Sequence, residues 1–247
     1  MANLNARYLA LTGPKGELAL NYAFFQSLHE QLGDFNLTQN QAEIAARYNY
    51  SPRLFLRYSL AFQHLLLGTR VFDYAVSTGP SLILLGEKGQ STRLDLGYRT
   101  TQYRNVSIFA NNEIRTGENF SATLTGSGAL SSSVSARVGF GIDRDETRSP
   151  LWDGTGQRLS AGLSVLLPHD SLFDLSADYA RKDYDGVYLS VGEKRTDKAW
   201  SAVLTLSTRF EDRYGLSLRG LYLRNHSNVR AFDLSRVIAG VLFDVKF

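Results

Sequence analysis

The stretch RLSAGLSVLL, residues 158–167, shows the pattern that decides the fold. From Leu159 to Leu167 every second residue is apolar, and most residues between them are polar or glycine. Successive side chains of a β-strand point to opposite faces, so a period of two predicts a strand with one apolar and one polar face. The same period recurs in residues 134–143 and 200–207. We therefore expect an all-β chain.

This pattern, bounded by turn residues, divides the chain into thirteen expected strands. Most have about 10 residues or more, the length of a tilted strand that crosses a membrane, whereas the mean strand of soluble proteins has about 5–6. The segments are Leu4–Thr12, Glu17–Gln26, Gln39–Tyr50, Leu54–Leu66, Asp73–Leu85, Thr92–Tyr103, Glu118–Leu130, Val134–Asp145, Gln157–Leu167, Phe173–Tyr184, Lys198–Phe210, Leu216–Asn225 and Ser235–Phe247.

The connections and the aromatic residues favour a barrel in an outer membrane over a soluble sandwich. Tight turns such as residues 13–16 and 51–53 alternate with longer loops such as 27–38, 104–117 and 185–197, as short periplasmic turns alternate with longer extracellular loops. Tyrosines gather near the expected strand ends, where an interfacial girdle would lie. These are Tyr48, Tyr50, Tyr58, Tyr98, Tyr103, Tyr179, Tyr184 and Tyr222.

The predicted fold is a transmembrane antiparallel up-and-down β-barrel that forms a single domain over residues 1–247. Bacterial barrels have an even number of strands, so thirteen segments suggest about 14, with 12 as the alternative. The extra strand would lie upstream of Asn3 or within Arg104–Gly117.

Composition excludes several other classes. No apolar run approaches the roughly 18–20 residues of a membrane-spanning helix; the longest resemble Val237–Phe243. The absence of cysteine excludes disulfide scaffolds, thiolate metal sites and thiol catalysis. A net charge of +3 is too small to predict a nucleic-acid partner. The mean hydropathy of −0.20 averages the apolar face with the polar one.

The end of the chain resembles the β-signal that the barrel assembly machinery recognises in outer-membrane proteins. Val241, Phe243, Val245 and the terminal Phe247 continue one apolar face and end in an aromatic residue. This resemblance implies a class of protein and says nothing of its function.

A narrower resemblance covers roughly the last 70–150 residues. Its residues are Leu167-Pro168, Tyr179, Tyr184, Arg195-Thr196-Asp197, residues 225–228 and residues 232–236. They are similar to the C-terminal barrel of Gram-negative proteins that carry N-terminal tetratricopeptide repeats, including surface lipoprotein assembly modifiers and related export barrels. The resemblance implies outward passage of lipoproteins or other cargo. It also implies a periplasmic repeat domain, which this sequence does not contain, so we expect an isolated barrel or a barrel-only relative.

The strand phase selects the residues expected to line a pore. They are Arg47, Arg57, Arg93, Arg99, Arg137, Arg158, Arg219, Arg236, Asp95 and Asp143, within a wall that has more bases than acids. Such a wall favours anions or an acidic polymer, since charged rings set the ion preference of pores. The alternative is that these charges pair across strands and stiffen the wall.

Nothing in the sequence indicates an enzyme, a metal site or a cofactor. His169 and Ser171 could share a strand face, but they follow Pro168, where residues of this kind form a turn. His64 falls on the expected lipid-facing phase, near the outer end of its strand. The glycines, such as Gly139 and Gly162, indicate bends or close strand packing.

The expected function is passage of exported cargo across the outer membrane. The alternatives are a passive diffusion porin with mild anion preference and a structural barrel in a larger envelope complex. The expected partners are outer-membrane lipid and lipopolysaccharide, the barrel assembly machinery and a periplasmic repeat domain or envelope subunits, with no nucleic acid and no cofactor.

Overall fold

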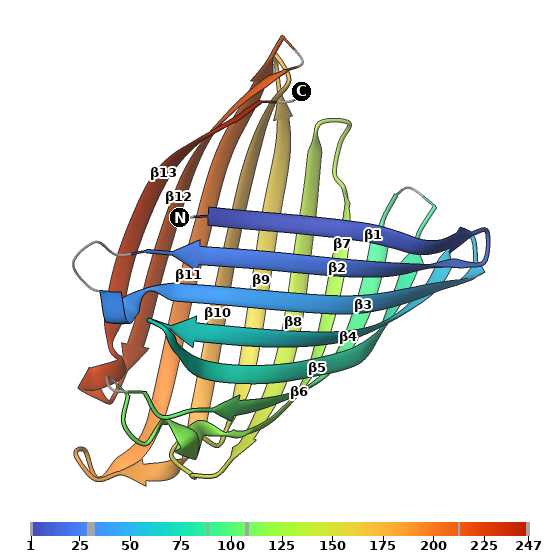
Figure 1. The fold of residues 1–247 in the computed structure, drawn as a ribbon. Helices are drawn as coiled ribbons and strands as arrows, with labels where there is room; N and C mark the ends of the chain where they lie inside the picture. The colour runs from blue at the N-terminus through green and yellow to red at the C-terminus, as the bar shows by residue number, and fades with distance from the viewer. Residues whose placement is uncertain (1, 29–32, 88, 107–108, 212, 246–247) are drawn as a thin grey trace. The chain divides into compact units, whose positions relative to one another are not determined.

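The computed structural model describes residues 2–28, 33–87, 89–106, 109–211 and 213–245, which form an antiparallel sheet. Its thirteen strands are ordered in the sheet as they are in the chain (Figure 1), which confirms the predicted all-β, up-and-down arrangement. The strands are β1 Ala2–Gly13, β2 Gly16–Ser27, β3 Leu37–Ser51, β4 Leu54–Leu67, β5 Arg70–Leu85, β6 Ser91–Tyr103, β7 Gly117–Ala129, β8 Val134–Thr147, β9 Gly154–Leu167, β10 Ser171–Tyr188, β11 Glu193–Phe210, β12 Tyr214–Ser227 and β13 Leu234–Val245.

Three short 3-10 helices occupy longer connections: η1 Gly33–Phe35, η2 Asn112–Arg115 and η3 Arg230–Phe232. In the described part of the chain, no helix has the length and apolar character needed to cross a membrane. The segment proposed to hide an extra strand, Arg104–Gly117, instead contains η2 and an isolated bridge between Val106 and Phe109 in its described residues.

The chain forms two compact units, which we describe separately. Unit 1 comprises Met1–Leu84, Leu94–Ala122 and Asp143–Gly154, and unit 2 comprises Leu85–Arg93, Thr123–Ile142 and Thr155–Phe247.

In unit 1, the register places like residues opposite one another across the first strands. Leu20 of β2 lies opposite Ile44 of β3, and Ile44 lies opposite Leu60 of β4. One residue further along, Ala45 lies between Ala19 and Ser59 on the other face. In these rows, large apolar residues share one face and small or polar residues share the other.

Unit 2 repeats this separation across β10 to β13. Leu206 of β11 lies opposite Phe173 and Leu218, and Leu218 lies opposite Val241 of β13. The adjacent row on the other face, Asp174, Thr205 and Arg219, is polar.

The main departure from prediction is at the connection between β10 and β11. Residues 185–197, expected to form a loop, are mostly strand: β10 continues to Tyr188 and β11 begins at Glu193. Both faces of this extension carry polar residues, so it has no apolar period to reveal it. Pairing of Val187 with Lys194 supplies backbone hydrogen bonds after a register shift that follows Asp183.

Gly79 of β5 tests how closely the strands of unit 1 approach. A Cβ atom there would lie 1.9 Å from the carbonyl oxygen of Leu96 on β6, which is backbone and cannot rotate away. We expect Gly79→Ala to lower the free energy of unfolding by about 1–3 kcal/mol, as overpacking does, measured from urea midpoints in detergent.

Gly220→Ala is the matched control, because a Cβ atom there meets nothing within 4 Å. Equal urea midpoints for the two variants would contradict the close approach of β5 and β6.

Candidate functional site

Large apolar side chains lie exposed on one face of the sheet in each unit. In unit 1, Tyr58 is 51 % exposed and Leu60 is 47 % exposed; in unit 2, Trp200 is 55 % and Val241 is 68 % exposed. The buried apolar residues among those described are alanines and valines: Ala19, Ala45, Ala75, Val106 and Val229. Large side chains therefore do not form a buried core in the described structure. We call these surfaces the apolar faces.

The opposite, polar face of unit 1 is crossed by ion pairs. Glu17 of β2 accepts hydrogen bonds from Arg7 at 3.0 Å and pairs with Arg47 at 3.4 Å. Arg57 of β4 pairs with Glu43 of β3. Arg47 and Arg57 lie directly opposite each other, and each has a carboxylate partner on the same face. Arg47 and Arg57, both predicted to line a pore, therefore form cross-strand ion pairs, which is the alternative that the sequence analysis left open.

The polar face of unit 2 has a comparable pair. Arg158 of β9 donates to the Oδ1 atom of Asp178 on β10 through Nε at 2.9 Å and Nη2 at 2.6 Å. Asp174, four residues earlier on β10, accepts a hydrogen bond from Ser164.

Four other arginines of the predicted set form a second group. In the described ranges, no carboxylate lies within the 4 Å of an ion pair from Arg99, Arg137, Arg219 or Arg236. Arg99 instead donates to two neutral oxygens, those of Thr101 at 3.2 Å and Gln63 at 3.3 Å.

The other predicted residues also fall on strands with the expected phase. Arg93 and Asp95 lie on β6, where Asp95 accepts a hydrogen bond from Ser81 of β5, and Asp143 lies on β8. The set is therefore spread along the sheet and does not converge on one point.

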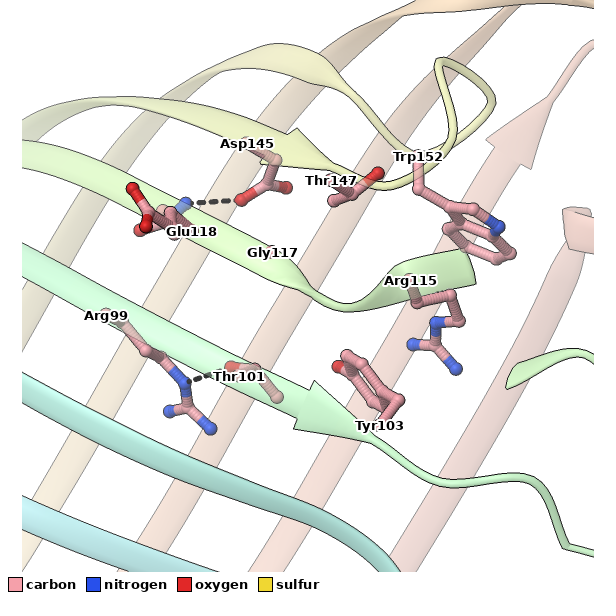
Figure 2. A pocket seen from close by; sticks show the side chains of 10 residues that line it. Arg99, Thr101, Tyr103, Arg115, Gly117, Glu118, Asp145, Thr147 and Trp152 are labelled. Atoms are coloured by element: carbon pink, nitrogen blue, oxygen red, sulfur yellow. Dashed lines mark hydrogen bonds between the residues drawn. The ribbon is translucent and has the colours of Figure 1, made fainter. Parts of the chain in front are cut away.

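A small pocket forms in unit 1 at the ends of β6, β7 and β8 (Figure 2). Its volume is about 120 Å³, and Arg115, the last residue of η2, lies between the rings of Tyr103 and Trp152. The Arg115 guanidinium carbon is 4.4 Å from the Tyr103 ring centroid and 4.7 Å from that of Trp152. Across the pocket, Asn119 donates to Asp145 at 2.6 Å.

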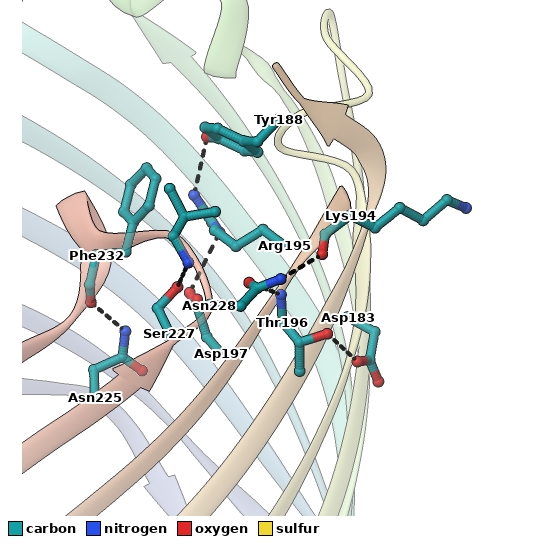
Figure 3. Close-up of polar contacts among 11 residues, drawn as sticks. Asp183, Tyr188, Lys194, Arg195, Thr196, Asp197, Asn225, Ser227, Asn228 and Phe232 are labelled. Carbon is teal, nitrogen blue, oxygen red and sulfur yellow. Dashed lines mark hydrogen bonds and ion pairs between the residues drawn. The ribbon is translucent and has the colours of Figure 1, made fainter. Parts of the chain in front are cut away.

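In unit 2 a second arginine is enclosed where β10 and β11 extend (Figure 3). The Arg195 side chain is 1 % exposed, and its guanidinium carbon lies 3.5 Å from the Tyr184 ring centroid and 3.9 Å from that of Phe232. It donates to the Tyr188 hydroxyl at 3.1 Å and pairs with Asp197 at 3.5 Å. Because Phe232 belongs to η3, this contact fastens the β12–β13 connection to β10 and β11.

A carboxylate next to Phe232 joins the same connection to β12. Asp233, just after η3, pairs with Arg224 at 2.7 Å and with His226 at 3.1 Å. The pKa of Asp233 lies below its usual value: burial alone would raise it, but the Arg224 charge and hydrogen bonds from the Ser227 backbone and His226 outweigh burial. The carboxylate stabilises the fold above its ordinary pKa, and this contribution is lost as the pH falls through the lowered value.

Some of the tyrosines predicted to form the interfacial girdle lie elsewhere in the structure. Tyr48, Tyr50 and Tyr58 are exposed near the tight-turn end of unit 1, as expected. Tyr103 and Tyr184 instead pack against Arg115 and Arg195. Counting every second residue along β6 and β10 places both tyrosines on the polar face. Strand phase alone therefore excludes them from a girdle on the apolar face.

Two of the histidines lie in a turn and against an aromatic ring. His169 and Asp170 have positive φ values of 59° and 49°, which place them in the tight turn before β10. His64 stacks on Tyr74 with ring centroids 5.1 Å apart. Among the described residues, no group of three or more His, Asp or Glu side chains is arranged to hold a metal ion.

The predicted assembly signal is partly described. Val241 and Phe243 are exposed on the apolar face of β13, and the backbone of Val245 pairs with Tyr214. Phe247 lies outside the described residues.

Comparison with known proteins finds similarity to solved structures. The chain matches no protein-family model and no curated protein. Among solved structures, that of the NanC porin aligns over 92% of this chain and 98% of its own, at 12% sequence identity and a TM-score of 0.44. The resemblance to tetratricopeptide-linked barrels finds no support in these comparisons and stays a prediction.

Two arginines that the structure holds between aromatic rings were not among the predicted pore-lining residues. Arg115 and Arg195 lie outside the expected strands, so strand phase could not assign them to a face. In the sequence, each of these arginines lies within a few residues of an aromatic residue at a strand end. This arrangement is common in loops, so it does not by itself predict a buried arginine.

Phe232→Ala tests whether the Arg195 contact fastens the β12–β13 connection. Removing the ring takes away one wall of the Arg195 site, so η3 should separate more often from β10 and β11. We expect trypsin to cleave after the exposed Arg230 at least several times faster than in the unaltered protein, measured by mass spectrometry of the fragments.

Phe210→Ala serves as the control, since Phe210 is exposed at the other end of β11. Cleavage after Arg230 at an unchanged rate in Phe232→Ala would rule out this fastening role.

Proposed function

We propose that this protein is an integral outer-membrane β-barrel that forms a channel for passive diffusion with a preference for anions. The exposure of large apolar side chains along both units is the observation that carries the proposal. A soluble chain of this length buries most of its large apolar residues. In a membrane, lipid covers them instead, and a sheet must close because unpaired backbone groups cannot be left in hydrocarbon.

The polar faces support a channel over a solid structural barrel. In unit 2, two open cavities of about 310 and 300 Å³ are lined by Arg137 together with small residues, including Gly162 and Ser164. Small side chains leave volume that water and solutes can occupy, and a barrel closed from the thirteen described strands is too wide for such residues to fill.

The division of the arginines supports an anion preference. Arg47, Arg57 and Arg158 are neutralised by carboxylates, so they contribute mainly to the stiffness of the wall. Arg99, Arg137, Arg219 and Arg236 have no carboxylate within ion-pair distance among the described residues, and they leave positive potential on the polar faces. The buried Asp73 carboxylate, on which the Arg99 charge acts from a longer distance, offsets part of the Arg99 contribution. Rings of such charges favour anions in pores.

Such a channel would be surrounded by lipid and inserted by a dedicated machinery. Outer-membrane lipid and lipopolysaccharide would cover the apolar faces, and the barrel assembly machinery would insert the chain by its C-terminal strand. Export of lipoproteins or other cargo is the second candidate, favoured only by the sequence resemblance of residues 167–236.

Planar-bilayer recording separates the two candidates. If the protein is a diffusion channel, the purified chain should give stable open steps of conductance without any added partner. A silent membrane containing correctly folded protein would favour gated export or a structural role. Solubility without detergent would contradict the membrane location itself.

The charge preference is tested with Arg99→Glu and Arg137→Glu, made separately and together. Each replaces a base that lacks a carboxylate partner with an acid, so the double variant should shift the reversal potential in a KCl gradient from anion towards cation selectivity.

Arg213→Glu makes the same change of charge in the tight turn before β12, outside the polar faces, and should leave the reversal potential close to that of the unaltered protein. If the double variant keeps the original selectivity, the unpaired arginines do not set it.

A further inference from the structure

On the apolar face of unit 2, the apolar rows end abruptly in a row of basic side chains. Tyr179 of β10 lies opposite Trp200 of β11, with ring centroids 4.3 Å apart. The next row on the same face, towards the β10–β11 connection, consists of Arg181, Lys198 and His226 on three adjacent strands. All three side chains are exposed.

This row is electrostatically unfavourable by itself. Arg181 lies directly opposite Lys198, and like charges at directly opposed positions destabilise a sheet. Arg224 adds a further positive charge beside Trp200, one row lower. An anion bound across these positions would remove the repulsion.

The nearby carboxylates offset this charge only in part. Asp183 accepts hydrogen bonds from Arg181 at 3.0 and 3.1 Å, and Asp233 pairs with Arg224 and His226. Two carboxylates thus face three permanently basic side chains, Arg181, Lys198 and Arg224. Lys198 occupies the centre of the row, between Arg181 and His226.

Unit 1 shows that a basic row is not a general feature of this face. The corresponding rows beyond Tyr22 contain Phe24, Asn40, His64 and Tyr74, followed by Gln26, Thr38 and Leu66. None of these positions carries Lys or Arg. The basic row is therefore a local feature of β10 to β12.

The height of the row indicates which molecules it meets in a membrane. Aromatic residues such as Trp200 and Tyr179 mark the interface between hydrocarbon and headgroups. A row one step beyond them lies at headgroup level, where basic side chains attract anionic lipids. It lies at the end opposite the tight turns, which is the extracellular end of such proteins.

We propose that Arg181, Lys198, Arg224 and His226 form a binding site for the phosphate groups of a lipid in the outer leaflet, of the lipid A type. The inference rests on the proposed outer-membrane location. The guanidinium groups of Arg181 and Arg224 provide planar donors that fit phosphate oxygens, and Lys198 adds a point charge between them. The adjacent apolar face, including Tyr179 and Trp200, accommodates the acyl chains.

Native mass spectrometry of the full chain in detergent tests the site, with diphosphorylated lipid A as the probe and phosphatidylcholine as the neutral reference. The unaltered protein should retain lipid A and not phosphatidylcholine. Each basic side chain near an anionic surface gives about a fivefold gain in affinity. The Arg181→Gln, Lys198→Gln double variant should therefore bind lipid A roughly 25-fold more weakly.

The matched control is Lys15→Gln with Arg213→Gln, which also removes one Lys and one Arg, both exposed in tight turns at the other end of the strands. It should retain lipid A as the unaltered protein does. An equal loss in both double variants would show attraction by overall charge, and unchanged retention in the Arg181 and Lys198 variant would show that the row is not the site. Either result overturns the proposal.

Measuring conductance in planar bilayers distinguishes a failure of the lipid-binding site from a failure of the proposed channel function. If all variants insert and conduct alike while lipid A retention is unaffected, the lipid site is wrong and the channel stands. If the unaltered protein does not insert at all, the outer-membrane proposal fails first.

Discussion

The register of strand pairing is the constraint on which the rest of the structure depends. A slip of one residue would exchange the two faces of a strand, because side chains alternate with a period of two. If β3 slipped by one residue, Ile44 would share a face with Glu17 of β2 and Arg57 of β4, and the ion pairs of Glu17 with Arg47 and of Arg57 with Glu43 would be broken. The separation of faces therefore fixes the register, and the register in turn sets which charges can meet.

The arginines show how one residue type serves several purposes on such a sheet. Arg57 and Arg158 join adjacent strands through carboxylates, a use that stiffens the wall. Arg99 and Arg137 have no carboxylate within ion-pair distance in the described part of the chain, so under the proposed function they are the charges that meet passing ions. Arg195 is enclosed by Tyr184 and Phe232, where cation–π contacts and the Asp197 carboxylate compensate for lost hydration. Position in the register decides among these uses.

The tyrosines and the long connections mark where prediction from the sequence succeeded and where it failed. The thirteen strands and the polar-face phase of the charged residues follow from alternation, which is a local property. Tyr184 was predicted to lie in the interfacial girdle because it is near a strand end, but its strand phase places it on the polar face, where it packs against Arg195. The strand extension near Val187 was missed because a strand that is polar on both faces has no alternation, and its stability comes from the partner strand.

The sequence by itself determined the fold class, the strand phases and the candidate pore-lining residues, since each depends on a period of two along one strand. Only the tertiary structure decided which arginines are neutralised, that Arg115 and Arg195 are held between aromatic rings, and that Arg181 and Lys198 lie side by side. These facts depend on pairing between segments that are separated in the chain. Alternation gives the face on which a residue lies, but the cross-strand register gives its neighbours.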